Sequence, residues 1–228
     1  MMLGKRVFSP QFNIHALSDM PTYKGVKLLG NTTMDAYGQI PAKDLTIVEK
    51  GLVKNFINDD KPALGAMTPT GKTFKVNSYA TDSGFGILHI TYEKTVPYSK
   101  MRKQLANEAR KAGLDYAYIV KSMGNDFTYL VRYDINTGEE EIVDMNGEGL
   151  SALSRKDMNH LTAVSNEESV LNKYTYVNFY QMNRKRVPWG GRPTSIIAPE
   201  AFIVENREIN FMQPRCGEDF NLKNPALR

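Results

Sequence analysis

The chain has 228 residues, of which 41% are hydrophobic and 10% aromatic, and its formal net charge is +4. This length and aromatic content exclude a largely disordered chain and predict one large domain or two small ones. No apolar run reaches the roughly 20 residues that cross a bilayer, no apolar signal-peptide segment follows the basic N-terminus, and the single cysteine excludes an internal disulfide.

The first third of the chain predicts short strands separated by turns. Residues 44–57 are expected to form a β-hairpin whose turn lies at Lys50-Gly51, because Lys-Gly is a turn-forming sequence between two apolar stretches. Residues 61–73 are rich in Pro, Gly and Thr and predict a loop. Two extended segments are predicted after this loop, at residues 74–81 and 85–93.

A helix is predicted over about residues 99–112. Its apolar side chains recur at helical spacing along one face, at Met101, Leu105, Ala109 and Ala112. Ser99 can accept a hydrogen bond from the free N–H groups of the first turn. Gly113 can adopt the left-handed conformation that ends many helices.

Several strands are predicted after this helix. Alternating side chains separated by turn sequences predict a three-stranded meander over residues 115–121, 127–133 and 139–143. Residues 150–161 predict a short helix or coil. Further strands are predicted at Tyr174–Met182, Ser195–Ala198 and Ala201–Val204.

These elements together predict an α+β fold made mostly of antiparallel β-sheet, with one clear amphipathic helix. We expect residues 1–210 to form a single domain. Residues 211–228 are polar and contain proline, so we expect an irregular C-terminal tail.

Gly71-Lys72-Thr73 resembles the end of a phosphate-binding loop, but its spacing excludes that function. Such a loop requires a glycine, four residues and then Gly-Lys-Thr. Here Gly65 leaves five intervening residues, one of them Pro69. No amphipathic helix is predicted after Thr73 to offer its N-terminal N–H groups to a phosphate.

The remaining reactive side chains form no recognisable catalytic pattern. The three histidines lie far apart in the sequence, at His15, His89 and His160, and we interpret each as structural. Cys216 has Arg215 beside it but no identifiable partner histidine, which predicts an inert thiol. The carboxylate runs Asp59-Asp60 and Glu139-Glu140-Glu141 are interpreted as solvated charges.

One basic segment, around residues 184–192, carries an alternative function. It contains Arg184, Lys185, Arg186 and Arg192. Such a cluster can bind nucleic acid or another polyanion. Short charge runs more often form a solvated loop between strands, and we favour that interpretation.

An ordered series of segments carries a family resemblance: Gly4–Ser9, Asp35–Pro41, Glu49–Val53, the predicted helix leading into Gly113–Val120, and Gly191–Phe202. Together, over residues 3–210, they resemble the C-terminal domain of the TldD/PmbA proteins, also called modulators of DNA gyrase. The resemblance implies a β-rich domain of an intracellular zinc-dependent peptidase that often acts as a two-chain assembly.

The chain departs from the family pattern at the metal site. The family holds zinc through a His-Glu-x-x-x-His helix and a later cysteine. This sequence contains no His-Glu pair, and Cys216 lies downstream of the expected cysteine. We therefore expect no catalytic residue and no bound metal in this chain, which would be a fragment or a non-catalytic partner. The missing helix would lie directly before residue 1, and zinc is expected only in a full-length protein or partner subunit.

The resemblance also implies partners. We expect a homo- or hetero-oligomer with a TldD/PmbA-like subunit, a peptide substrate and a cytoplasmic location, without membrane or nucleic acid. An extended peptide can be captured by adding to a sheet edge. The surface expected to contact the peptide or the partner comprises Tyr176, Phe179, Arg184, Arg186 and Trp189.

Overall fold

The computed structural model describes residues 3–58, 73–75, 81–123, 127–143, 155–175, 178–182 and 185–204. The chain divides into two compact units, one formed by Met1–Glu108 with Leu153–Asn206 and the other by Ala109–Ala152 with Arg207–Arg228. The predicted tail at 211–228 and most of the predicted loop at 61–73 lie outside the described residues.

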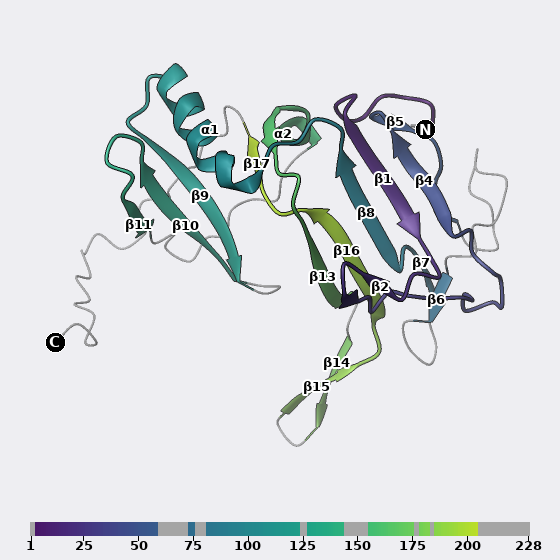
Figure 1. Cartoon of the computed structure of the whole chain (residues 1–228). Helices are drawn as coiled ribbons and strands as arrows, with labels where there is room; N and C mark the ends of the chain where they lie inside the picture. The colour runs from purple at the N-terminus through teal and green to yellow at the C-terminus, as the bar shows by residue number, and fades with distance from the viewer. Residues whose placement is uncertain are drawn as a thin grey trace. The chain divides into compact units, whose positions relative to one another are not determined.

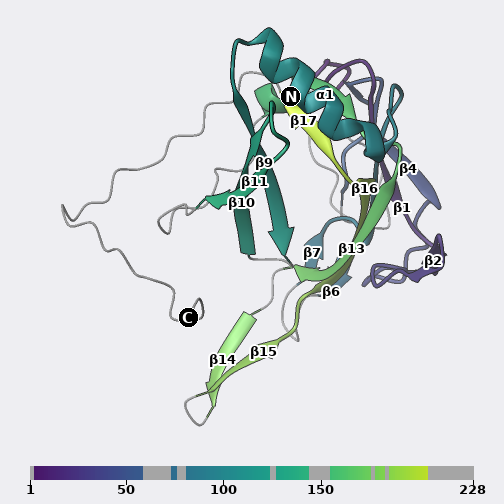
Figure 2. The same ribbon diagram turned by 60° about the vertical axis from the view of Figure 1, so that its left-hand side comes forward.

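The first unit is organised around a six-stranded sheet. In spatial order its strands are β13 (Glu168–Thr175), β16 (Arg192–Pro199), β8 (Ile87–Tyr92), β1 (Phe12–Leu17), β4 (Asp44–Glu49) and β5 (Leu52–Val53). Neighbouring strands are antiparallel except for β16 and β8, which are parallel. β13 and β16 lie side by side at one end of this sheet (Figures 1 and 2). The mostly antiparallel, strand-rich architecture agrees with the predicted fold class.

The predicted hairpin over 44–57 is confirmed as β4 and β5. Its two turn residues both have positive φ, 48° at Lys50 and 75° at Gly51, which suits a two-residue turn between right-twisted strands. A Cβ atom at position 51 would lie 2.2 Å from the carbonyl oxygen of Phe8. Glycine is therefore required here by close backbone approach as well as by the turn.

Shorter strand pairs accompany the large sheet. They are β2 (Thr22–Tyr23) with β3 (Val26–Lys27), β6 (Thr73–Lys75) with β7 (Thr81–Ser83), β12 (Leu161–Val164) with β17 (Phe202–Val204), and β14 (Asn178–Met182) with β15 (Lys185–Trp189). A short helix, α2 (Arg155–Asn159), precedes β12. The two ends of the predicted strand Tyr174–Met182 thus belong to different strands, β13 and β14, with different pairing partners.

The predicted helix is confirmed as α1 (Tyr98–Lys111), and the boundary between the two units falls within it. The predicted end of the helix at Gly113 is confirmed. Gly113 has φ 72°, and the Leu114 N–H donates to the Ala109 carbonyl at 2.9 Å. The prediction for the N-terminus of the helix is wrong, because Ser99 lies inside the helix. The Tyr98 N–H is instead bonded at 2.7 Å by the carboxylate of Glu167, far away in the sequence.

The second unit contains the predicted meander, confirmed as β9 (Tyr116–Met123), β10 (Phe127–Asp134) and β11 (Glu140–Val143) (Figure 1). β10 is the central strand and pairs antiparallel with both neighbours. Asp134 shapes the turn between β10 and β11, where its carboxylate accepts from the backbone N–H groups of Asn136 and Thr137. These hydrogen bonds lower the pKa of Asp134.

Two hydrophobic clusters stabilise the first unit. One joins Leu28 to Ile87 and Ile197 on the large sheet and includes Leu17, Met20, Tyr23 and Val170. The other packs the first turns of α1 on β12 and β17 through Met101, Ala163 and Ile203. No helix within the described ranges is long and apolar enough to cross a membrane.

Candidate functional site

A group of polar side chains surrounds Glu168, the first residue of β13. The β2–β3 hairpin lies near it and turns at Lys24 and Gly25, whose φ angles are 48° and 82°. This tight turn places Tyr23 and Lys24 beside each other at the hairpin tip. His89 comes from β8, two strands away from β13.

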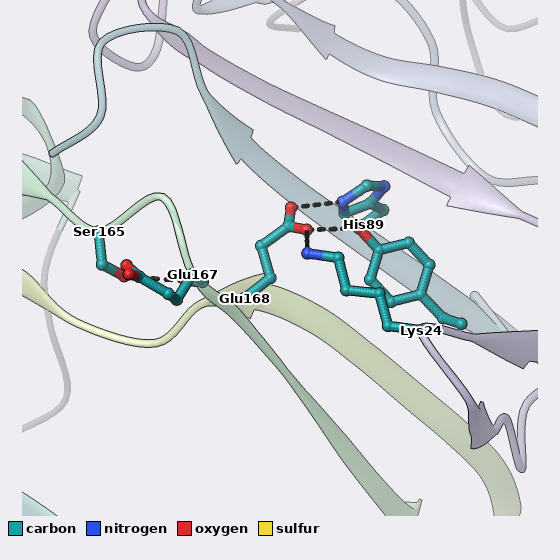
Figure 3. Close-up of polar contacts among 6 residues, drawn as sticks. Lys24, His89, Ser165, Glu167 and Glu168 are labelled. Carbon is teal, nitrogen blue, oxygen red and sulfur yellow. Dashed lines mark hydrogen bonds and ion pairs between the residues drawn. The ribbon is translucent and has the colours of Figure 1, made fainter. Parts of the chain in front are cut away.

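Three donors converge on the Glu168 carboxylate (Figure 3). The Tyr23 hydroxyl donates a hydrogen bond to Oε2, and the Lys24 ammonium lies 2.9 Å from the same oxygen. His89 Nε2 lies 2.9 Å from Oε1. Both carboxylate oxygens are therefore occupied, and residues from three separate parts of the chain are held together.

Charge and burial act in opposite directions at Glu168. Partial burial of the carboxyl raises its pKa, but the hydrogen bonds from the three donors outweigh burial and lower the pKa to about 2. The carboxylate therefore stays ionised at neutral pH. Burial and the hydrogen bond to Glu168 raise the pKa of Tyr23, and the hydrogen bond to Glu168 raises that of Lys24.

The side chains around Glu168 form a setting for a cation. The Lys24 ammonium lies 5.2 Å from the centroid of the Tyr23 ring, on which it makes a cation–π contact. The rings of Tyr23 and His89 meet edge to face, with centroids 5.5 Å apart. We call Glu168, Tyr23 and His89 the carboxylate cage.

A second polar anchor lies four residues further along β13. Asn172 shares a face of the strand with Glu168, and its side chain bonds the Leu29 N–H and the Lys27 carbonyl. Its oxygen also accepts from the Ser195 hydroxyl at 2.6 Å. The segment after the β2–β3 turn is thus fastened to β13 at two points.

The neighbouring Ser165 and Glu167 serve the backbone instead. The Ser165 hydroxyl donates to the Glu167 carbonyl at 2.9 Å (Figure 3). It also accepts from the Ala201 N–H at 3.0 Å. The Glu167 carboxylate caps α1. Both groups are therefore occupied by hydrogen bonds that hold the backbone.

β13 also offers an edge. It pairs along its whole length with β16 on one side, and no described strand pairs with its other side. Leu171 and Tyr174 on this strand are large side chains that remain exposed, by 40% and 55%. An unpaired strand edge presents backbone N–H and C=O groups that another chain can bond.

The predicted surface residues are only partly within the described chain. Phe179 lies on β14, and Arg186 and Trp189 lie on β15. Tyr176 and Arg184 lie outside the described residues. The basic segment 184–192, predicted as a loop, contains the strand β15 and the start of β16.

The burial of Arg192 removes this residue from the predicted polyanion-binding segment. Arg192 is only 5% exposed, donates to the Ser83 carbonyl at 3.2 Å and lies 5.6 Å from the centroid of Phe85. A Cβ atom at Gly84 would lie 1.8 Å from its guanidinium. Arg192 therefore packs inside the first unit and does not face a polyanion.

The histidines have three different settings. His89 is in β8, where it was predicted, and contacts Glu168. His15 is in β1, directly opposite His89, and its Nδ1 lies 2.8 Å from Asp44. His160 is exposed after α2. Cys216 and the Asp59-Asp60 run lie outside the described residues, and Glu139–Glu141 are exposed as predicted.

Sequence reasoning missed the cage itself. The Lys24-Gly25 dipeptide between Tyr23 and Val26 is a hairpin signal that could have located the β2–β3 turn. Glu168 carries no local signal, because its partners lie 79 and 145 residues away in the sequence.

The carboxylate cage does not provide the donors that a metal ion needs. In the part of the chain that the structure describes, His, Cys, Asp and Glu side chains form no group of three or more that could hold a metal ion. The cage supplies one carboxylate and one histidine, both bonded to each other. A zinc ion has no fitting donor set among these residues.

Comparisons with known proteins found a matching family and a similar solved structure. A family model for the PmbA/TldA metallopeptidase C-terminal domain matches residues 1–205. The crystal structure of TldE from Thermococcus kodakarensis is similar at 14% sequence identity with a TM-score of 0.48, covering 87% of this chain and 39% of that chain. The chain thus spans well under half the length of that protein. No curated protein matches this chain.

Proposed function

The chain belongs to the PmbA/TldA metallopeptidase C-terminal domain family, and we propose that it is a non-catalytic domain of such a peptidase. In this proposal it shapes the peptide-binding groove and contacts a TldD/PmbA-like subunit that carries the zinc. One observation supports it above all: the family match covers residues 1–205, yet the sequence contains no His-Glu pair. Proteolysis, oligomer formation and a cytoplasmic location are parts of the same proposal.

The unpaired edge of β13 is the element proposed to receive the peptide. An extended peptide gains affinity from main-chain hydrogen bonds when it adds to a sheet edge, and exposed side chains nearby give specificity. Leu171 and Tyr174 are the exposed apolar side chains along this strand. Leu171 and Tyr174 are three residues apart and lie on opposite faces of the strand. In the proposal they contact peptide side chains on opposite faces.

Two measurements on the purified full chain test whether it binds zinc and whether it cleaves peptides by itself. We expect no zinc to remain after dialysis against a chelator, by elemental analysis, and no cleavage of a peptide library, by mass spectrometry. Addition of a family subunit that has the His-Glu-x-x-x-His helix should restore cleavage. One zinc held per chain, or cleavage by the chain alone, would contradict the proposal.

Peptide capture at the strand edge is tested with modified peptides. In an added strand, alternate N–H groups point toward the sheet and the others point away. N-methylation of one alternate set in a mixed-sequence octapeptide should abolish binding, measured by fluorescence anisotropy. Methylation of the other set is the matched control and should leave binding largely intact. Equal effects of both sets would argue against strand addition.

The alternative function is a polyanion-binding module on the β14–β15 hairpin. β15 carries Lys185 and Arg186 on one strand of a paired ribbon, whereas Arg192 is excluded by its burial. Binding of duplex DNA or RNA should then weaken linearly in log affinity with log salt concentration. A Lys185→Gln/Arg186→Gln variant should reduce that slope, and absence of binding at low salt removes this alternative.

A further inference from the structure

The parts of the Glu168 cluster differ in how firmly they are held. Glu168 and His89 are largely buried, with 16% and 20% of their side chains exposed. The Lys24 side chain is 57% exposed. Tyr23 is anchored because its ring belongs to the hydrophobic cluster of Leu28, Ile87 and Ile197. The carboxylate cage is therefore held in place by its surroundings. The ammonium that occupies it belongs to Lys24, whose exposed side chain can move away into solvent.

The cage has the chemistry that recognises a primary ammonium group. A carboxylate oxygen 2.9 Å from the nitrogen provides a charge-assisted hydrogen bond. The Tyr23 ring, with its centroid 5.2 Å away, adds a cation–π contact. Tyr23 and His89 hold the carboxylate in place from the other sides.

We propose that the cage of Glu168, Tyr23 and His89 is a binding site for a primary ammonium group of an extended peptide, and that Lys24 occupies it in the free protein. Glu168 is the first residue of β13, and its carboxylate reaches His89 of β8 over the face of the sheet, so the N-terminal end of a peptide on β13 must extend over this face to enter the cage. The inference rests on that proposed function, because the peptide is what brings the amine to the site.

Displacement of Lys24 is feasible on energetic grounds. An ion pair whose ammonium is largely in solvent contributes little, since water and salt replace the contact. A Lys24 side chain that leaves the cage regains water around its ammonium, and Glu168 keeps its hydrogen bonds with Tyr23 and His89. When backbone hydrogen bonds hold a peptide on β13, the ammonium group of that peptide stays near the cage. It therefore competes with Lys24 at high effective concentration.

The test compares three octapeptides labelled at the C-terminus. One has a free α-amine and no lysine, the second is its N-acetylated form, and the third is acetylated but contains one lysine. Anisotropy titrations of the full chain should show about tenfold weaker binding after acetylation. Recovery of affinity with the third peptide would identify the lysine side chain as the source of the ammonium, and no recovery would identify the α-amine.

Variants of the protein assign the effect to the cage. Lys24→Met removes the competing ammonium and should tighten binding of the free-amine peptide about threefold, with no change for the acetylated peptide. Lys43→Met is the matched control, because Lys43 pairs with Asp19 outside the cage. Glu168→Gln should abolish the difference between the free and acetylated peptides, and circular dichroism checks that this variant folds.

The outcomes separate this inference from the proposed function. Equal binding of all three peptides, unchanged in Lys24→Met, overturns the ammonium site and leaves peptide capture at β13 standing. Binding of none of the peptides overturns both.

Discussion

Two histidine–carboxylate pairs lie side by side on the large sheet. Their N–O distances are almost equal, but their carboxylates differ in exposure and in the number of hydrogen-bond donors. His15 on β1 and His89 on β8 are direct cross-strand partners. His15 lies 2.8 Å from Asp44, and His89 lies 2.9 Å from Glu168. The Asp44 side chain is 54% exposed, whereas that of Glu168 is 16% exposed and accepts from two further donors.

The comparison shows that the distance between two charged groups does not give the energy of their interaction. Exposed pairs contribute little because water screens the charges and competes for the same hydrogen bonds. A partly buried carboxylate has lost water, so the hydrogen bonds from its less exposed donors, Tyr23 and His89, contribute more. We therefore expect the Glu168 cluster to stabilise the fold and the Asp44 pair to contribute little.

The largest expected difference is in the response to acid. The folded pKa of Glu168 is about 2, below its ordinary value of 4.5, which corresponds to roughly 3 kcal/mol of stability. Because the folded pKa is depressed, this stability is fully present above pH 4.5 and is lost as pH falls toward 2. Urea unfolding followed by circular dichroism should show this loss, and Glu168→Gln should flatten the same part of the profile.

The next largest expected effect on the free energy of unfolding comes from removing the Glu168 carboxylate. Glu168→Ala leaves the Tyr23 hydroxyl and His89 Nε2 without their acceptor, and we expect a loss of about 2 kcal/mol at pH 7. Urea denaturation measures it. An equal loss from Asp44→Ala would contradict the comparison between the two pairs.

A smaller effect is expected from Tyr23→Phe. This substitution keeps the ring in its hydrophobic cluster and removes only the hydroxyl that donates to Glu168. We expect a loss of about 1 kcal/mol in the free energy of unfolding. The acid transition of Glu168 should also move to higher pH, because one hydrogen bond to the carboxylate is gone; an unmoved transition would show that Tyr23 does not set this pKa.

The smallest effect is expected from Asp44→Asn. The pair with His15 is exposed on the carboxylate side, so the change in the free energy of unfolding should stay within about 0.5 kcal/mol. A double-mutant cycle with His15→Ala should give a coupling energy of similar size. A coupling as large as that between His89 and Glu168 would show that the two pairs are equivalent after all.

Elements built from short-range contacts were predictable. The hairpin at Lys50-Gly51, the end of α1 at Gly113 and the β9–β11 meander all depend on residues close together in the chain. Turn chemistry, helical spacing and alternation encode such elements directly. The absence of a His-Glu pair could also be read directly from the residues.

The candidate site could not be predicted in the same way. Glu168 pairs with Lys24, which lies 144 residues away in the sequence. Glu167 caps α1 at Tyr98, which lies 69 residues away. Arg192 looks in the sequence like one more cation in a basic segment, and the tertiary structure shows that it is buried. The sequence by itself determined which local elements form and which family pattern they follow. Tertiary structure alone decided which charges meet, because charge pairing over such separations depends on strand order and burial, neither of which is encoded in any local pattern.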